Sequence, residues 1–198
     1  MKLIFISGPS GSGKTTISNQ IILKNKNGFV LNTDNYYKTG LKSKLLSKLV
    51  EGYFDKMISF NYKLFKKDFD FIVKNGISIH KRYYDFEKKK IQNIFYETKN
   101  ISYLIVEGIF AEEFSKNIYN QNYYFLEIKD NKHECMKRVV QRDFKERGKD
   151  KKQAEIDFLK SWDIYYEKFK TNRTKKNTNK FIINKKTDID NLLKKLLN

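Results

Sequence analysis

A glycine-rich segment near the start of the sequence has the residue types of a phosphate-binding loop. Residues 8–15 read Gly-Pro-Ser-Gly-Ser-Gly-Lys-Thr and match the pattern G-x-x-x-x-G-K-[ST]. Glycines allow a tight turn in which backbone N–H groups converge on phosphate oxygens, and a following helix offers its positive N-terminus to the same anion. Lys14 can reach the β- and γ-phosphates, and the hydroxyl of Thr15 can bind Mg²⁺. The segment therefore predicts a nucleoside triphosphate site rather than a flexible glycine turn.

Two acidic residues follow short apolar segments, at the points where strands of an α/β sheet would end. Asp34 follows residues 29–32, and Glu107 follows residues 101–106. Ligands and catalytic groups gather outside the carboxyl ends of such strands. Glu107 can hold Mg²⁺ directly or through water, and Asp34 can take the proton of an attacking hydroxyl group; phosphoryl transfer requires both tasks. Each acid alone also fits a structural role, Asp34 as a helix cap or turn residue and Glu107 as a surface acid.

The apolar segments and the helical patterns between them predict how these residues are positioned. Strands are expected at residues 2–7, 29–32, 101–106, 123–128 and 181–183, and a hairpin at 77–84 and 90–97. Helices are expected at residues 14–24, 42–50, 61–74, 132–146, 151–170 and 189–197. This alternation predicts an α/β protein with the three-layer α/β/α fold of P-loop NTPases. Its sheet would be mainly parallel and five-stranded, with a small β-hairpin insertion, in one domain over residues 1–198.

Composition limits the classes of protein to which the chain can belong. Hydrophobic residues make up 39% of the 198 positions and aromatic residues 15%, so a folded core is expected. Apolar stretches are too short to span a membrane, and the single cysteine, Cys135, excludes an internal disulfide. A reducing, cytoplasmic location is the resulting expectation.

The formal net charge of +18 raises the question of a nucleic-acid partner. The charge is spread along the chain, and only five of the 41 basic residues are arginine, the residue that dominates base reading. Most lysines are therefore expected on a solvated surface, and a nucleic-acid partner is not expected. Arg138, Arg142 and Arg147 fall within ten positions. Because guanidinium groups can bracket two phosphate oxygens, they predict a lid over the triphosphate rather than a helix surface with ion pairs.

Five motifs follow one another along roughly the first 150 residues. They are the phosphate loop at 8–16, Thr-Asp-Asn-Tyr-Tyr-Lys at 33–38, Tyr-Asp-Phe at 84–86, Val-Glu-Gly-Ile at 106–109, and an Arg-Asp and Glu-Arg-Gly segment at 142–148. In order and spacing this set resembles the uridine (uridine/cytidine) kinases of the phosphoribulokinase/uridine kinase group of P-loop kinases. The loop is common to many nucleotide-binding families, whereas the whole set is much more specific.

This resemblance implies an enzyme that uses ATP and Mg²⁺ to phosphorylate the 5′-hydroxyl of a nucleoside, a small-molecule partner. Homo-oligomers are also expected from it. Asp34, Lys14 and Arg142 would be catalytic, and Thr15 and Glu107 would hold the metal. The nucleotide would contact Gly8, Ser10, Gly11, Ser12, Gly13, Lys14, Thr15, Thr16, Arg138 and Arg147. The acceptor would contact Asp34, Tyr37, Tyr84 and Arg142.

The sequence departs from the family at the expected acceptor pocket. The family's His-Pro-Asp segment, which provides a ribose contact, aligns with Lys-Met-Ile at 56–58, so Ile58 stands in place of an acid; Asp55 and Asn61 are nearby polar alternatives. A histidine that contacts the base aligns within Glu-Lys-Lys-Lys at 87–90, which includes Lys89. The acceptor can therefore also be another sugar or a sugar phosphate. A third alternative is a non-catalytic basic module that binds nucleotides or nucleic acid.

Overall fold

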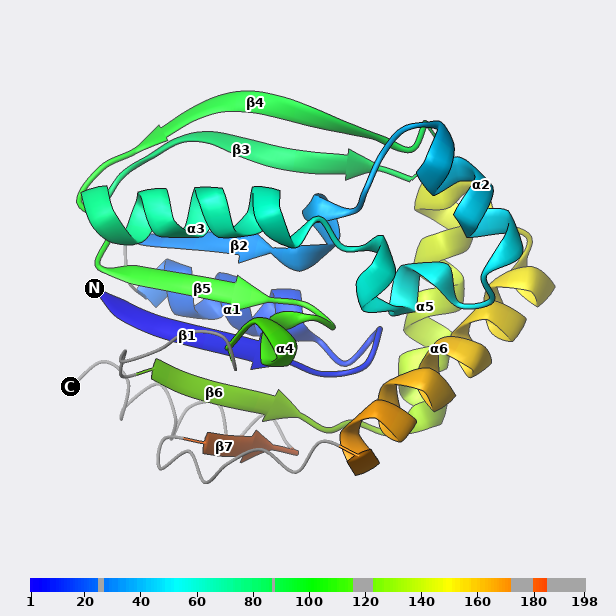
Figure 1. Ribbon diagram of the computed structural model, residues 1–198. Helices are drawn as coiled ribbons and strands as arrows, with labels where there is room; N and C mark the ends of the chain where they lie inside the picture. Colours follow the sequence, from blue (N-terminus) through cyan, green and yellow to red (C-terminus); the bar gives the residue numbers. More distant parts are fainter. Residues whose placement is uncertain (25–26, 87, 116–122, 172–179, 185–198) are drawn as a thin grey trace.

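The computed structural model describes residues 1–24, 27–86, 88–115, 123–171 and 180–184. Its main sheet has five parallel strands in the order β2-β5-β1-β6-β7 (Figure 1). Their bounds are β1 Lys2–Ser7, β2 Gly28–Asn32, β5 Tyr103–Glu107, β6 Tyr123–Ile128 and β7 Lys180–Ile183. The predicted parallel sheet is therefore confirmed, and β1 lies at its centre.

Strand β1 is apolar on both sides because both faces of the sheet are covered. Leu3 and Phe5 belong to one hydrophobic cluster, whereas Ile4 and Ile6 belong to a second cluster on the opposite face. All four side chains are buried. A parallel strand enclosed in this way has a continuous apolar run instead of the alternation of a half-exposed strand.

Helices on both faces complete the three layers (Figure 1). Helix α1 (Lys14–Lys24) packs on one face through Ile17 and Ile21. Helix α3 (Tyr62–Asn75) and the short α4 (Ala111–Ser115) cover the other face. The three-layer α/β/α arrangement is thereby confirmed.

Aromatic rings fill the layer between α3 and the sheet. Phe65 and Phe69 are four positions apart, which places both rings on the same side of α3. Phe65 is fully buried, with its ring centroid 4.9 Å from that of Tyr36 and 4.4 Å from that of Phe114. These edge-on contacts join α3 to α4 and to the turn after β2, so the core supports the segment that contains Asp34.

An antiparallel hairpin, β3 (Ser78–Asp85) and β4 (Lys90–Thr98), forms the second sheet and lies beside α3 (Figure 1). The Tyr36 hydroxyl and the Arg82 guanidinium of β3 both donate to the buried carboxylate of Asp68 on α3. Charge-assisted hydrogen bonds of this kind are stronger than neutral ones. They tie the hairpin to the turn after β2.

Three helices lie beyond the carboxyl ends of the parallel strands (Figure 1). They are α2 (Leu41–Leu49), α5 (Lys132–Arg147) and α6 (Lys151–Thr171). The Asn131 side chain caps the first turn of α5, and Gly148 ends the helix in the left-handed region at φ 61°. Helix α5 then packs against α6 through Cys135, Val139 and Phe158.

The boundaries of the predicted long elements agree with the structure to within one or two residues. Several short elements were not predicted. Helix α4 and the 3₁₀ turns η1 (Thr33–Tyr36), η2 (Tyr53–Asp55) and η3 (Met57–Ser59) are each too short to show periodicity. The helix predicted at 189–197 lies outside the described residues. Among the residues that are described, no helix combines the length and apolarity needed to cross a bilayer.

Replacement of Phe65 by alanine should lower the stability of the whole protein. The Phe65→Ala variant removes a fully buried ring, so the free energy of unfolding should fall by about 3–5 kcal/mol. Phe95→Ala is the matched control, because the Phe95 side chain is 80% exposed and its loss should change stability by less than about 0.5 kcal/mol. Urea denaturation measures both, and equal effects would contradict this description of the core.

Candidate active site

The phosphate loop folds between β1 and α1, as its sequence predicts. The Lys14 ammonium donates to the carbonyl oxygens of Gly8 and Pro9, each at 2.9 Å, so the side chain curls over the loop. Burial lowers the pKa of Lys14, while the charges of Asp34 and Glu107 oppose that shift. Gly11 has φ 79°, and a β-carbon there would lie 2.5 Å from the Cys135 carbonyl oxygen. Only glycine therefore allows α5 to approach the loop this closely.

The Glu107 carboxylate at the end of β5 joins three elements. It is buried and accepts hydrogen bonds of 2.9–3.1 Å from the side chains of Thr15, Ser18 and Asn32. Burial raises the pKa of Glu107, and the nearby Lys14 charge lowers it. The surface-acid alternative is wrong, because this carboxylate is enclosed by polar groups of α1 and β2.

The pair formed by Thr15 and Glu107 suits a magnesium ion. A hydroxyl oxygen and a carboxylate oxygen lie 3.1 Å apart, and Mg²⁺ prefers such hard oxygen ligands. One or two protein ligands suffice, because phosphate oxygens and water complete the coordination of Mg²⁺ at nucleotide sites. The residues present therefore fit the metal that the sequence predicts.

Asp34 lies in η1, two positions after the last residue of β2. The Asn32 side chain accepts a hydrogen bond of 2.8 Å from the Asp34 backbone N–H and caps this turn, so Asn32 has the capping role considered for Asp34. The Oδ1 atom of Asp34 is buried and has no hydrogen-bond partner within the described structure. Buried polar atoms are nearly always paired, so an unpaired carboxylate oxygen beside a phosphate loop marks a place for a ligand.

Two cavities meet at Asp34. The smaller, of about 200 Å³, is lined by residues 10, 11 and 13–15 of the phosphate loop together with Asn32, Glu107, Arg138 and Arg142; Gly8 and Ser12 are absent from its lining. The larger, of about 510 Å³, extends between the hairpin, α2, α5 and α6. Four residues line both cavities: Ser10, Asp34, Val139 and Arg142. The arrangement can therefore hold a triphosphate in one cavity and an acceptor in the other, with Asp34 and Arg142 at the junction.

The three arginines of α5 take different positions. Arg142 donates two hydrogen bonds to Asp143, of 2.9 and 2.7 Å, and lines both cavities. Arg138 lines only the phosphate cavity, where it donates to the Gly11 carbonyl at 3.0 Å. Arg147 lines only the larger cavity, with its guanidinium 3.9 Å from the ring centroid of Phe86.

Asp143 joins these arginines, and sequence reasoning missed it as a site residue. Its carboxylate is buried and forms ion pairs with Arg142 at 2.7 Å, Arg147 at 3.4 Å and Lys149 at 3.7 Å. Because both guanidinium groups pair with one carboxylate, they lie close together in the lining of the larger cavity. The Arg-Asp pair at 142–143 was the available signal.

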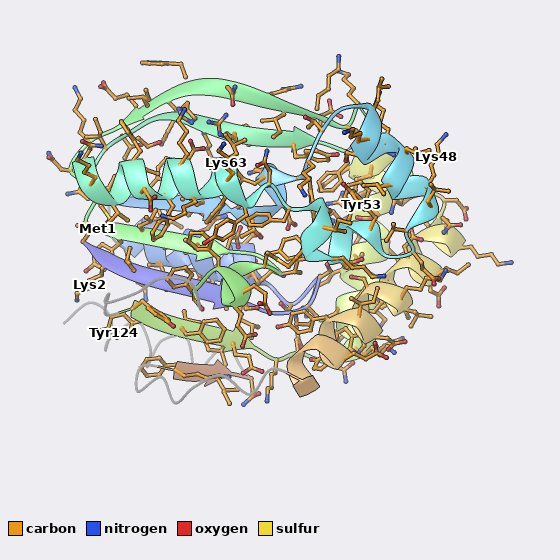
Figure 2. All side chains as sticks on the ribbon, in the orientation of Figure 1. Met1, Lys2, Lys48, Tyr53, Lys63 and Tyr124 are labelled. Atoms are coloured by element: carbon orange, nitrogen blue, oxygen red, sulfur yellow. The ribbon has the colours of Figure 1, made fainter. Side chains whose placement is uncertain are left out.

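Aromatic rings form one wall of the larger cavity. Tyr37, Tyr53, Phe54 and Phe86 line it, and Figure 2 shows Tyr53 beneath α2. Tyr84 is buried behind this wall, with its ring centroid 5.2 Å from that of Tyr37 and 5.0 Å from that of Phe86. Its hydroxyl has no partner in the described structure, and burial raises the pKa of Tyr84 to about 12. Tyr84 thus supports the cavity wall rather than lining it.

Asp55 brings a carboxylate into the larger cavity. Ile58, the residue that stands in place of the family's acid, does not line this cavity. Ile58 is 46% exposed and lies outside the lining, while the Asn61 side chain caps α3. Asp55 lines the cavity and accepts a 2.7 Å hydrogen bond from Ser161 of α6. Of the two polar alternatives considered, the structure places only Asp55 at the cavity. Thr16, in the first turn of α1, lines neither cavity.

Comparison with known proteins agrees with this geometry. The sequence model of the Phosphoribulokinase / Uridine kinase family matches residues 3–190. The chain belongs to this family. It is therefore an ATP-dependent small-molecule kinase. Uridine kinase of Borrelia hermsii is 30% identical over 171 residues, which cover 85% of this chain and 80% of that protein. Uridine kinase of Ureaplasma parvum is 28% identical over 182 residues, or 89% and 85% of the two chains.

Solved structures share the fold at low sequence identity. A possible uridine kinase from Bacillus stearothermophilus has a TM-score of 0.55 at 16% identity, over 84% of this chain and 81% of the other. D-glycerate 3-kinase from Cryptococcus neoformans has a TM-score of 0.63 at 13% identity, over 92% and 86% of the two chains. These likenesses establish the fold of this kinase.

The pH dependence of stability should report the burial of Asp55. Desolvation raises the pKa of Asp55 to about 6 from a reference value of 3.8. The folded protein thus binds the proton more tightly than the unfolded chain, so the Asp55 contribution to stability falls as pH rises through this window. Asp55→Asn lacks the titration, and its stability relative to the natural protein should rise by roughly 1–3 kcal/mol between about pH 4 and pH 7. A pH-independent difference in urea denaturation would contradict the assignment.

Replacement of Arg142 by lysine should impair turnover far more than folding. Arg142→Lys keeps the charge but loses the planar fork at the junction of the cavities, so kcat should fall by about 100-fold. The Arg142 side chain is only partly buried, so the free energy of unfolding should change by less than about 1 kcal/mol. Steady-state kinetics and urea denaturation measure the two effects. Unchanged turnover would remove Arg142 from the active site.

Proposed function

We propose that this kinase transfers the γ-phosphoryl group of ATP to the 5′-hydroxyl group of a nucleoside. The observation that supports the proposal most is the buried, unpaired Oδ1 of Asp34 at the junction of the phosphate cavity and the larger cavity. A hydroxyl group in the larger cavity would meet the terminal phosphate there. Its products would be the nucleoside 5′-monophosphate and ADP.

The phosphate cavity would hold MgATP. Backbone N–H groups of residues 8–15 would bind the β- and γ-phosphates, and Lys14 would leave its carbonyl partners for phosphate oxygens. Thr15 and Glu107 would hold Mg²⁺, which would neutralise part of the phosphate charge. Arg138, beside Gly11, would contact the triphosphate from α5.

Asp34 would act as the base and Arg142 as the cation of the transfer step. The acceptor oxygen forms a bond to the γ-phosphorus while the bond from that phosphorus to the β–γ bridging oxygen breaks, and ADP leaves. The hydroxyl proton passes to Asp34. Arg142, with Lys14, would stabilise the charge that spreads over the transferred group.

The larger cavity would bind the nucleoside. Its aromatic wall offers flat apolar surface to a base, and the Asp55 carboxylate offers a hydrogen-bond acceptor to ribose hydroxyls. The curated relatives named uridine kinase, which align over most of the chain, favour a pyrimidine nucleoside. Tyr37 would contact the acceptor directly, and Tyr84 would act through the wall that it supports.

A sugar phosphate is the second candidate acceptor. Four lysines line the larger cavity, which a neutral nucleoside does not require: Lys48, Lys89, Lys149 and Lys160. The transfer step would be the same, with Asp34 accepting the proton of a sugar hydroxyl group.

Removal of the base should abolish transfer while nucleotide binding survives. Asp34→Asn cannot accept the hydroxyl proton, so kcat should fall by about 10²–10⁴-fold. The Kd for a non-hydrolysable ATP analogue with Mg²⁺, measured by calorimetry, should change little, because the loop and the metal pair are intact. Asp70→Asn is the control: Asp70 is an exposed α3 residue paired with Lys66, and its loss should leave turnover unchanged. Full activity of Asp34→Asn would show that the base is elsewhere.

A further inference from the structure

Three polar residues line the larger cavity and are absent from its junction with the phosphate cavity. Ser47 and Lys48 come from α2, and Lys89 comes from the turn between β3 and β4. Figure 2 labels Lys48 on α2. Lys89 has φ 50°, a left-handed conformation that few residues other than glycine adopt. These three residues, here called the distal subsite, are absent from the lining of the phosphate cavity.

The hydrogen bonds of the distal subsite leave it rich in donors. The Lys89 ammonium donates to the Ser47 hydroxyl oxygen at 2.9 Å, and this hydroxyl donates its own proton to the Lys44 carbonyl at 2.8 Å. An ammonium group has three N–H donors and no acceptor. Lys89 therefore has further N–H groups to offer a ligand, while the Ser47 oxygen is already engaged.

The other basic residues of the cavity differ from the two lysines of the distal subsite. Lys149 pairs with Asp157 at 2.8 Å, and Lys160 pairs with Glu51 at 2.7 Å. Arg142 and Arg147 share Asp143. Among the described residues, no carboxylate lies within 4.0 Å of the ammonium of Lys48 or Lys89. The positive charge of these two lysines thus remains for a bound molecule.

We infer that the distal subsite recognises an oxygen acceptor atom of the substrate, either a carbonyl oxygen or an anionic oxygen. The inference rests on the proposed phosphoryl transfer and adds a selection rule to it. If position 4 of a pyrimidine base faces the distal subsite, the 4-carbonyl of uracil would accept a hydrogen bond from Lys89, whereas the 4-amino group of cytosine would present N–H donors to an ammonium group. Neither set of donors then has a partner, which costs binding energy. The subsite should select uridine over cytidine.

An acceptor panel with MgATP tests the selection rule through ADP release. The natural protein should use uridine at least about 10-fold better than cytidine, in kcat/KM. Lys89→Met should raise the uridine KM and bring the ratio close to one, while the KM for MgATP stays unchanged. A pentose phosphate in the panel distinguishes a carbonyl oxygen from an anionic oxygen. If the natural protein prefers the pentose phosphate to uridine and Lys89→Met removes this preference, the subsite is supported and its ligand atom is anionic.

Lys88→Met is the matched control, because it removes the same charge one position away. The Lys88 side chain is 69% exposed, pairs with Asp85 and does not line the cavity, so the uridine-to-cytidine ratio should be that of the natural protein. Equal use of cytidine and uridine without a preferred pentose phosphate, or acceptor selectivity that Lys89→Met leaves unchanged, would overturn the inference.

Direct binding separates this inference from the proposed function. Calorimetric titration of uridine and of the pentose phosphate into the protein with MgADP measures the subsite without transfer. Lys89-dependent binding without ADP release would refute the proposed transfer and retain the subsite. If ADP is released but Lys89→Met changes neither the binding of the acceptor nor the selectivity, the proposed transfer is retained and the subsite is refuted. If the protein neither binds these acceptors nor releases ADP with them, both the proposed transfer and the distal subsite are overturned.

Discussion

The buried carboxylate of Glu107 is the interaction on which the rest of the site depends. It ends the strand that pairs with both β1 and β2, and it accepts hydrogen bonds from Thr15 and Ser18 of α1 and from Asn32 of β2. Burial makes an ionised carboxylate costly unless its oxygens are paired, so these three donors are held in place. Asn32 in turn caps the turn that contains Asp34. One buried acid thus fixes the phosphate loop relative to the proposed base.

The acceptor half of the site is assembled from elements outside the sheet. Asp68 ties the hairpin to the turn after β2, since Arg82 and Tyr36 donate to the same carboxylate. Asp143 has a similar role on α5, where it forms ion pairs with the guanidinium groups of Arg142 and Arg147. Asp143 orders cations that would otherwise repel one another, whereas Asp68 orders one guanidinium group and one hydroxyl group. Under the proposed function, the carboxyl edge of the parallel sheet and α5 would hold the triphosphate, and the hairpin with α2, α5 and α6 would select the acceptor.

The fold was largely predictable because its signals are local. Apolar strands, a glycine loop and capped helices each have a sequence pattern, and the loop identified Lys14, Thr15 and the elements around them. The larger cavity was not predictable, because its lining residues come from seven segments that only the tertiary structure brings together. Ile58 departs from the family pattern, but in the structure its side chain lies outside the cavity. Asp55 and Asp143 line the cavity, although no periodic pattern in the sequence marks them. The arginine cluster indicated a lid, but its three members divide between the two cavities.

The most direct test of the account is a crystal structure with a non-hydrolysable ATP analogue, Mg²⁺ and uridine. The terminal phosphate should lie in the loop at residues 8–15, with the metal between it, Thr15 and Glu107. The acceptor hydroxyl should lie within about 2.6–3.2 Å of an Asp34 carboxylate oxygen and in line with the terminal phosphorus. A triphosphate bound elsewhere, or an Asp34 carboxylate remote from both the hydroxyl and the phosphorus, would contradict the account.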